Sequence, residues 1–160
     1  MIEVIPTKKQ ISVAKRKSKE MGVLNNSITD GKGNVYGFLG ELLVNEYIGG
    51  KSKNTYDYDI IKDDIKIDVK TKTCTSPPQP HYYCSVAAYN IRQKCDVYFF
   101  VRIMEDFSRA WILGGCSKDY FYKHAQLNKK GTIDESSSYK WKFKADCYNL
   151  PISKLKKIPV

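Results

Sequence analysis

The sequence lacks the segments that mark several protein classes. No run of about 18 apolar residues could span a membrane, and the first ten residues, MIEVIPTKKQ, lack the apolar stretch of a secretory signal. The five cysteines form no CxxC pair and are odd in number, and there are only two histidines. These absences argue against a membrane protein, a disulfide framework and a zinc ribbon. We therefore expect a cytoplasmic protein with reduced thiols and no membrane partner.

Acidic residues are scarce relative to basic ones. The chain has 27 Lys and Arg against 17 Asp and Glu, which gives a formal net charge of +10. This imbalance favours a polyanionic partner such as DNA, because a basic side chain near a phosphate releases condensed counterions. Charge alone leaves a simple solvated basic surface as the alternative.

The order of predicted elements indicates an α/β or α+β fold around a mixed sheet. The length of 160 residues fits one domain, with a basic N-terminal helix or arm at 1–24, a loop at 25–34 and a core at 25–155. Apolar spacing and end signals predict three helices and a series of strands. The helices are expected at 7–21 (Thr7 as N-cap; Ile11, Ala14 and Met21 inward), at 35–48 and at 118–131, and the strands at 56–72 (a hairpin), 81–88, 96–103, 109–116 and 139–150.

Basic side chains gather in the segments 8–19, 129–130 and 140–144. They could contact DNA phosphates or form solvated faces, and the sequence leaves both possibilities open. The individual candidates for phosphate contact are Lys15, Arg16, Lys72, Lys140 and Lys142.

The segment YDYDIIKDDIKIDVK predicts a hairpin with a two-residue turn at Asp63-Asp64. Ile60 then pairs with Ile67, and both face the core. A slip of one residue would exchange the two faces of the hairpin. The register therefore decides which polar side chains meet.

In this register Asp59 lies opposite Asp68 and Asp57 lies opposite Lys70, with all four side chains on one face. Facing carboxylates repel each other, whereas Mg²⁺ can bind both. A lysine beside the metal could orient a water molecule or stabilise negative charge on a phosphate. An ordinary ion pair between Asp57 and Lys70 on a solvent-facing hairpin is the alternative.

Gly40-Glu41 on a helix, then Asp59, then Asp68-Val69-Lys70 on the second hairpin strand resembles the PD-(D/E)xK nuclease superfamily. The segments GFLGELLVNEYIG, CDVYFFVRI and WILGGCSKDYF are similar to small bacteriophage-encoded endonucleases, so the resemblance covers residues 25–155. It implies a restriction-endonuclease-like mixed β-sheet flanked by helices, and a DNA endonuclease that acts in the host cytoplasm. Asp59, Asp68 and the carbonyl of Val69 would bind Mg²⁺ or Mn²⁺, Glu41 would lie near the same metal, and Lys70 would act in phosphodiester hydrolysis.

Some residues depart from the family pattern or extend it. Tyr58 replaces the proline that precedes the first aspartate, and Asp57 remains an alternative to Asp59 as metal ligand. Gln93 follows the third strand, where some relatives place a glutamine near the site. His81, at the mouth of the expected cleft, is a candidate for proton transfer.

Three other functions compete with a nuclease of ordinary DNA. One is a Holliday-junction or branched-DNA resolvase on the same scaffold, another is a non-catalytic DNA-binding protein, and the third is a protein-interaction module. A chain of this size would need a homodimer or successive nicks to cut both strands of a duplex.

Overall fold

A computed structural model describes residues 1–22, 34–53, 55–136 and 138–156 of the chain. The predicted loop at 25–34 and the predicted boundary at 24/25 lie almost wholly outside these residues. The helices are α1 (Lys8–Met21), α2 (Asn34–Ile48) and α3 (Lys118–His124). Short 3-10 helices follow at Ala88–Arg92 and Ile152–Lys154. The strands are β1 (Ile2–Val4), β2 (Lys51–Ser52), β3 (Ile60–Lys62), β4 (Ile65–Cys74), β5 (Tyr83–Ala87), β6 (Val97–Met104), β7 (Ala110–Ser117), β8 (Gln126–Asn128) and β9 (Cys147–Pro151).

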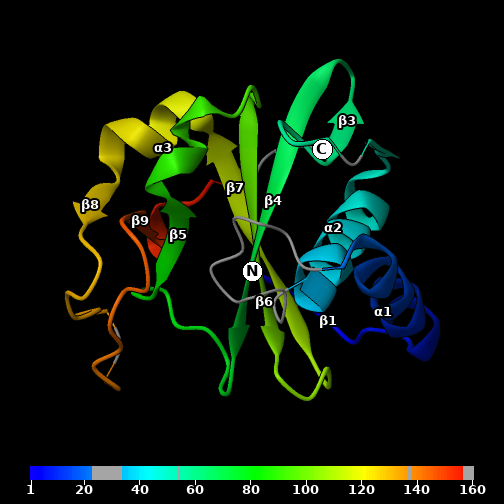
Figure 1. Cartoon of the computed structure of the whole chain (residues 1–160), viewed down its shortest axis with the longest axis horizontal. Helices are drawn as coiled ribbons and strands as arrows, with labels where there is room; N and C mark the ends of the chain where they lie inside the picture. The colour runs from blue at the N-terminus through cyan, green and yellow to red at the C-terminus, as the bar shows by residue number, and fades with distance from the viewer. Residues whose placement is uncertain (23–33, 54, 137, 157–160) are drawn as a thin grey trace.

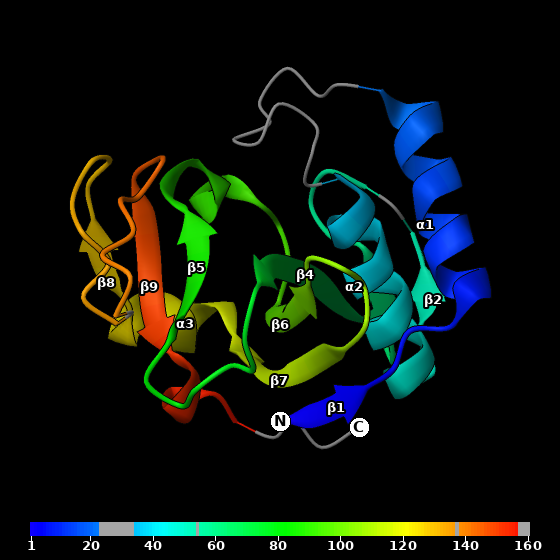
Figure 2. The same cartoon turned by 90° about the horizontal axis from the view of Figure 1, so that it is seen from below.

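The strands form a large mixed sheet and a small antiparallel one. The large sheet has the order β1-β7-β6-β4-β3-β2, in which β4 and β6 are parallel, and the small sheet has the order β5-β9-β8. Helices α1 and α2 cover one face of the large sheet, while the small sheet and α3 lie on the other side (Figures 1 and 2). The structure therefore confirms the predicted α+β fold, a mixed sheet flanked by helices.

Helix α1 begins where the sequence predicts. The side chain of Thr7 accepts a hydrogen bond from the Gln10 backbone at 3.1 Å, and the Gln10 side chain accepts one from the Thr7 backbone at 2.7 Å. This reciprocal capping satisfies two backbone N–H groups at the helix start. Ala14 is buried in the core as expected, but Met21 is 38% exposed and does not face inward.

Helix α2 packs against β4 through a close contact at Gly40. A Cβ atom at Gly40 would lie 2.0 Å from Oγ1 of Thr71, whereas one at Gly37 would meet nothing within 4 Å. The helix therefore approaches β4 closely at Gly40 and not at Gly37. The helix ends at Ile48, and the next residue, Gly49, has a φ of +64° that suits a residue without a Cβ.

Strand β4 separates two cores. Ile67 and Val69 belong to the core beneath α1 and α2. The alternate residues Asp68, Lys70 and Lys72 project from the other face, toward the small sheet. One strand thus supplies apolar packing on one side and a row of charged groups on the other.

Two predicted elements are shorter than expected. Helix α3 ends at His124 rather than 131, because the chain turns to pair β8 with β9. Of the strand predicted at 139–150, only its end forms β9; within the described part of 138–146, a single bridge joins Lys142 to Ile133. Both errors come from tertiary pairing that local periodicity does not show.

Candidate active site

The hairpin of β3 and β4 has the predicted register. Ile60 pairs with Ile67, and the turn residues Asp63 and Asp64 have φ values of 47° and 63°. Positive φ at both central positions is the geometry of a two-residue hairpin turn whose twist matches the strands. The prediction from the sequence is confirmed for the pairing and for the turn.

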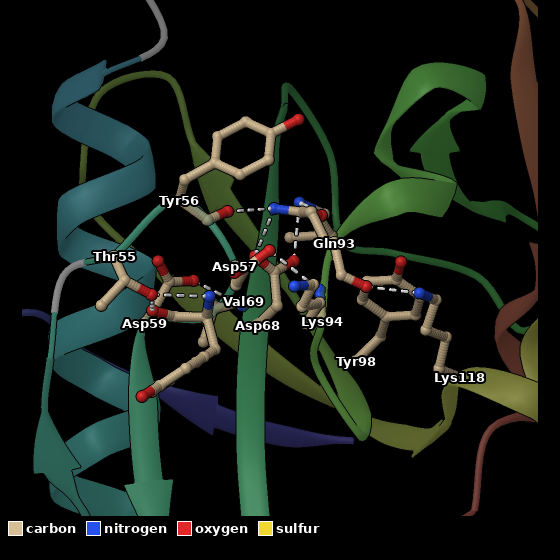
Figure 3. Close-up of polar contacts among 12 residues, drawn as sticks. Thr55, Tyr56, Asp57, Asp59, Asp68, Val69, Gln93, Lys94, Tyr98 and Lys118 are labelled. Carbon is tan, nitrogen blue, oxygen red and sulfur yellow. Dashed lines mark hydrogen bonds and ion pairs between the residues drawn. The ribbon is translucent and has the colours of Figure 1, made fainter.

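Beyond Ile67 the edge of β4 that faces β3 is open, and Asp59 caps it. The Asp59 backbone N–H donates to the Ile67 carbonyl at 2.9 Å, and Asp59 Oδ2 accepts from the Val69 backbone N–H at 2.7 Å. Asp59, directly before the first residue of β3, thus takes the place of a further strand residue. Its carboxylate is fixed beside the β4 backbone and next to Asp68 (Figure 3).

A polar triad built around the buried Asp68 occupies the same stretch of β4. Asp68 is 3% exposed, and its Oδ2 lies 2.6 Å from Lys70 Nζ. Gln93 Nε2 donates to Asp68 Oδ1 at 3.1 Å, and Lys70 Nζ donates to Gln93 Oε1 at 3.1 Å. Each of the three side chains therefore contacts the other two.

Gln93 is itself held by groups from distant parts of the chain. Its Nε2 also donates to the Tyr56 carbonyl at 2.8 Å, and its backbone N–H donates to the Asn90 carbonyl at 3.0 Å. Lys118 Nζ donates to the Gln93 carbonyl and, at 2.8 Å, to the Ile91 carbonyl. These contacts orient the amide toward Asp68 (Figure 3) and, through its Oε1, toward Lys70.

The electrostatics of the site disfavour three ionised carboxylates. Burial raises the pKa of Glu41 to about 8, and the negative charge of Asp59 is the next cause. Burial, followed by the charge of Asp68, raises the pKa of Asp59 to about 7, although the Val69 N–H and Lys70 act in the opposite direction. Lys17 and Lys70 lower the pKa of Glu41 but do not compensate for the crowding. The cluster therefore needs a proton or a cation.

Asp57 does not occupy its expected position. Its Oδ1 accepts a hydrogen bond from the Lys94 backbone at 3.0 Å, so it ties the chain before β3 to the segment after the first 3-10 helix. The predicted cross-strand pair of Asp57 with Lys70 is wrong. The physical reason is that β3 starts only at Ile60, so the ladder does not extend back to residue 57.

The donor set fits a hard divalent cation in its chemistry. Asp68 Oδ2 is buried and accepts no well-directed hydrogen bond, with the Lys70 ammonium as its charge partner. Carboxylate and carbonyl oxygens are the usual ligands of Mg²⁺. In the part of the chain that the structure describes, no three His, Cys, Asp or Glu side chains converge on one metal position. A metal would therefore take two carboxylates together with other oxygens, and the Val69 backbone lies beside Asp59.

The other predicted site residues lie apart from this cluster. His81 is exposed and contacts the ring of Tyr82. Lys15 lies over the ring of Phe107 on the helical side, and Arg16 forms an exposed i,i+4 pair with Glu20. Lys140 is exposed, and Lys72 and Lys142 line a cleft described below.

No helix in the described residues is both long and apolar enough to cross a membrane.

Three residues of the site were not predicted. Tyr98 is fully buried, its ring lies 5.9 Å from Lys70 Nζ, and its hydroxyl is 3.1 Å from that of Tyr122. Tyr56 accepts from the Gln93 side chain with its backbone carbonyl, and the Lys118 ammonium donates to the Gln93 carbonyl. A backbone carbonyl leaves no signal in residue identity, and the role of Lys118 depends on a packing contact between segments 25 residues apart, so the sequence pattern did not show these two roles.

Comparison with known proteins gives no family assignment, since no protein-family model and no curated protein matches the chain. The functional argument therefore depends on the residues and their geometry.

Proposed function

We propose that the chain is a metal-dependent DNA endonuclease that hydrolyses phosphodiester bonds at Glu41, Asp59, Asp68 and Lys70. One observation carries the proposal: Asp59 is fixed on the β4 backbone beside the buried Asp68, next to a lysine that a buried amide holds in place, and the charges of both aspartates act on Glu41. Such crowding raises carboxyl pKa values and is costly for a purely structural site. The resemblance of the motif to PD-(D/E)xK nucleases supports the same conclusion.

Mg²⁺, or Mn²⁺ in its place, is the proposed cofactor. Asp59, Asp68 and the Val69 carbonyl would hold it, with Glu41 close by. When bound, the ion supplies Lewis-acid chemistry at the phosphate. It also supplies the positive charge that the carboxylates lack.

Lys70 provides a fixed cation next to the position of the scissile phosphate. Its ammonium is held between Asp68 Oδ2 and Gln93 Oε1, and its side chain is 20% exposed. A preorganised positive charge stabilises negative charge that develops on phosphate oxygens in the transition state. Gln93 acts as a positioning residue, because it fixes both Asp68 and Lys70.

The net charge of +10 supports DNA as the substrate. Lys15, Arg16, Lys72, Lys140 and Lys142 are the proposed phosphate contacts. Cleavage of both strands of a duplex would take either two copies of the chain or two successive nicks.

The test is a cleavage assay with matched variants. Linear, nicked, single-stranded and four-way DNA are incubated with the purified protein in Mg²⁺, Mn²⁺ or EDTA. We expect metal-dependent cleavage that Asp68→Asn abolishes and that Lys70→Met lowers by at least about 100-fold. Asp57→Asn is the control, because it removes a nearby carboxylate that accepts a hydrogen bond from the Lys94 backbone instead of facing Lys70. Circular dichroism verifies that each variant is folded.

Each alternative has its own result. Cleavage that survives Asp68→Asn excludes this site. Tight DNA binding without cleavage in any metal indicates a non-catalytic DNA-binding protein. A strong preference for four-way DNA indicates a junction-resolving enzyme.

A further inference from the structure

A cleft of about 500 Å³ adjoins the candidate active site. Lys70 is one of its lining residues, and the cleft runs between the charged face of β4 and β6, strand β5 and the described residues 134–136 and 139–147. Its walls combine cations with aromatic rings, among them Lys72, Arg102, Tyr82, Trp141 and Lys142. No residue proposed above to bind the metal lines it.

Two cations stand side by side in the cleft. Lys72 and Arg102 are register partners on the parallel strands β4 and β6, so their like charges repel each other. Burial lowers the pKa of both groups, and the positive charge of Arg102 lowers that of Lys72 further. The Lys72 side chain keeps access to solvent, and it lines the cleft. The pair therefore needs a negative charge from elsewhere.

The described residues do not supply that charge through an ion pair. Within the described residues no ion pair reaches Lys72 or Arg102, and the guanidinium makes one hydrogen bond, to the Tyr83 carbonyl at 2.8 Å. Asp134 is a neighbouring carboxylate, but its Oδ1 accepts from the Ser136 N–H at 2.9 Å and from the Ser136 hydroxyl. An anion of the size of a phosphate would complete the charge balance.

Aromatic rings lie beside the cation pair. Trp141 lines the cleft and is 61% exposed, and Phe143 also lines it and is 8% exposed. Tyr82 lies under Arg102, with its ring 6.0 Å from the guanidinium carbon. Exposed aromatic rings bind nucleobases of single strands by stacking, with little regard to sequence.

The spacing along β4 connects the cleft with the reaction centre. Lys70 and Lys72 project from the same face and are two residues apart, roughly 7 Å along the strand. A nucleic-acid strand with one phosphate at Lys70 can therefore place a neighbouring nucleotide in the cleft.

We propose that the cleft binds one unpaired nucleotide of the DNA strand, with its phosphate on Lys72 and Arg102 and its base on Trp141. The inference rests on the proposed function in taking DNA as the ligand. A nucleotide inside a duplex has its base stacked and paired, so it must leave the helix before it can enter such a pocket. The favoured substrate therefore contains a single-stranded segment next to the scissile bond.

The test is a binding measurement that needs no cleavage. A labelled short oligothymidylate and a duplex of equal length are titrated with the full-length protein in EDTA, and anisotropy gives the Kd at several salt concentrations. Tryptophan fluorescence is followed in parallel, since of the two tryptophans Trp141 is exposed and Trp111 is 5% exposed. The variants are Trp141→Ala, Lys72→Gln and, as the matched control outside the cleft, Lys123→Gln.

We expect the single strand to bind more tightly than the duplex and to quench the fluorescence. Trp141→Ala should weaken single-strand binding by about tenfold. Lys72→Gln should make the plot of log binding constant against log salt concentration less steep by about 0.7, whereas Lys123→Gln leaves the slope unchanged. Equal affinity for both DNA forms, or equal behaviour of the two lysine variants, overturns the proposal.

The two proposals fail separately. Single-strand binding that depends on Lys72 and Trp141, in a protein that cuts no DNA, supports the cleft and refutes the nuclease. If Asp68→Asn abolishes cleavage but substitution of Lys72 and Trp141 leaves single-strand binding unchanged, only the proposal for the cleft is refuted.

Discussion

Replacement of Gln93 by leucine should destabilise the protein considerably, although the two side chains are similar in size. Gln93 is 6% exposed, and both polar atoms of its amide are used. Its Nε2 donates to Tyr56 O and Asp68 Oδ1, and its Oε1 accepts from Lys70 Nζ. Leucine would remove all three hydrogen bonds and leave their partners in place.

The magnitude follows from the partners. The bond to the Tyr56 carbonyl contributes about 1 kcal/mol, and each bond to a charged partner contributes about 1.5 kcal/mol, which gives about 4 kcal/mol. Water can recover roughly 1 kcal/mol at Lys70, because its side chain is 20% exposed while that of Asp68 is only 5% exposed. The expected loss in the free energy of unfolding is therefore about 3 kcal/mol, a fall in Tm of roughly 6–12 °C for a chain of this size.

Urea and thermal unfolding followed by circular dichroism would measure the loss. Gln79→Leu is the matched control, since Gln79 is exposed and the same substitution there should change stability by less than about 0.5 kcal/mol. A double-mutant cycle with Lys70→Met should give a coupling energy of at least about 1 kcal/mol between Gln93 and Lys70. A loss below about 1 kcal/mol for Gln93→Leu, or strict additivity in the cycle, would refute the role given to this amide.

Two further predictions concern the carboxylates and helix α2. Glu41 and Asp59 have ordinary pKa values of 4.5 and 3.8, and in the fold these rise to about 8 and about 7. Between the ordinary and the raised values the folded protein binds more protons than the unfolded chain, so its stability falls as the pH rises through this range. Mg²⁺ should therefore raise Tm more near pH 8 than near pH 6, and an equal rise at both would contradict metal binding by these groups. Gly40→Ala should cost about 1–3 kcal/mol in unfolding experiments, because its Cβ would lie 2.0 Å from Thr71 Oγ1. Gly37→Ala, with open space around it, should instead be stabilising by up to about 1 kcal/mol, and equal effects at the two positions would disprove the contact.

The hairpin register was predictable because two independent signals agree. The alternation of Ile60 and Ile67 with polar residues fixes which side faces the core, and a two-residue turn fixes the pairing. The position of Asp68 and Lys70 on one face follows directly from this register. The charged face of β4 was therefore available from local pattern alone.

The hydrogen-bond partners of the site residues could not be predicted in the same way. Asp57 bonds to Lys94 and not to Lys70, since the strand begins later than the alternation suggests. Gln93 reaches Asp68 across 25 positions of sequence, and its orientation depends on backbone carbonyls that any residue could offer. A sequence pattern predicts faces and periods, but long-range hydrogen bonds depend on how separate elements pack.

The alternation along β4 also limits how this protein can change during evolution. Ile67, Val69 and Thr71 serve the helical core, while Asp68 and Lys70 serve the opposite face. Substitutions on one face can accumulate without disturbing the other. Insertion or deletion of a single residue in this strand would exchange the two roles, moving a carboxylate under the helices and an apolar side chain into the site. We therefore expect the length of this strand to be inherited more strictly than most of its residues.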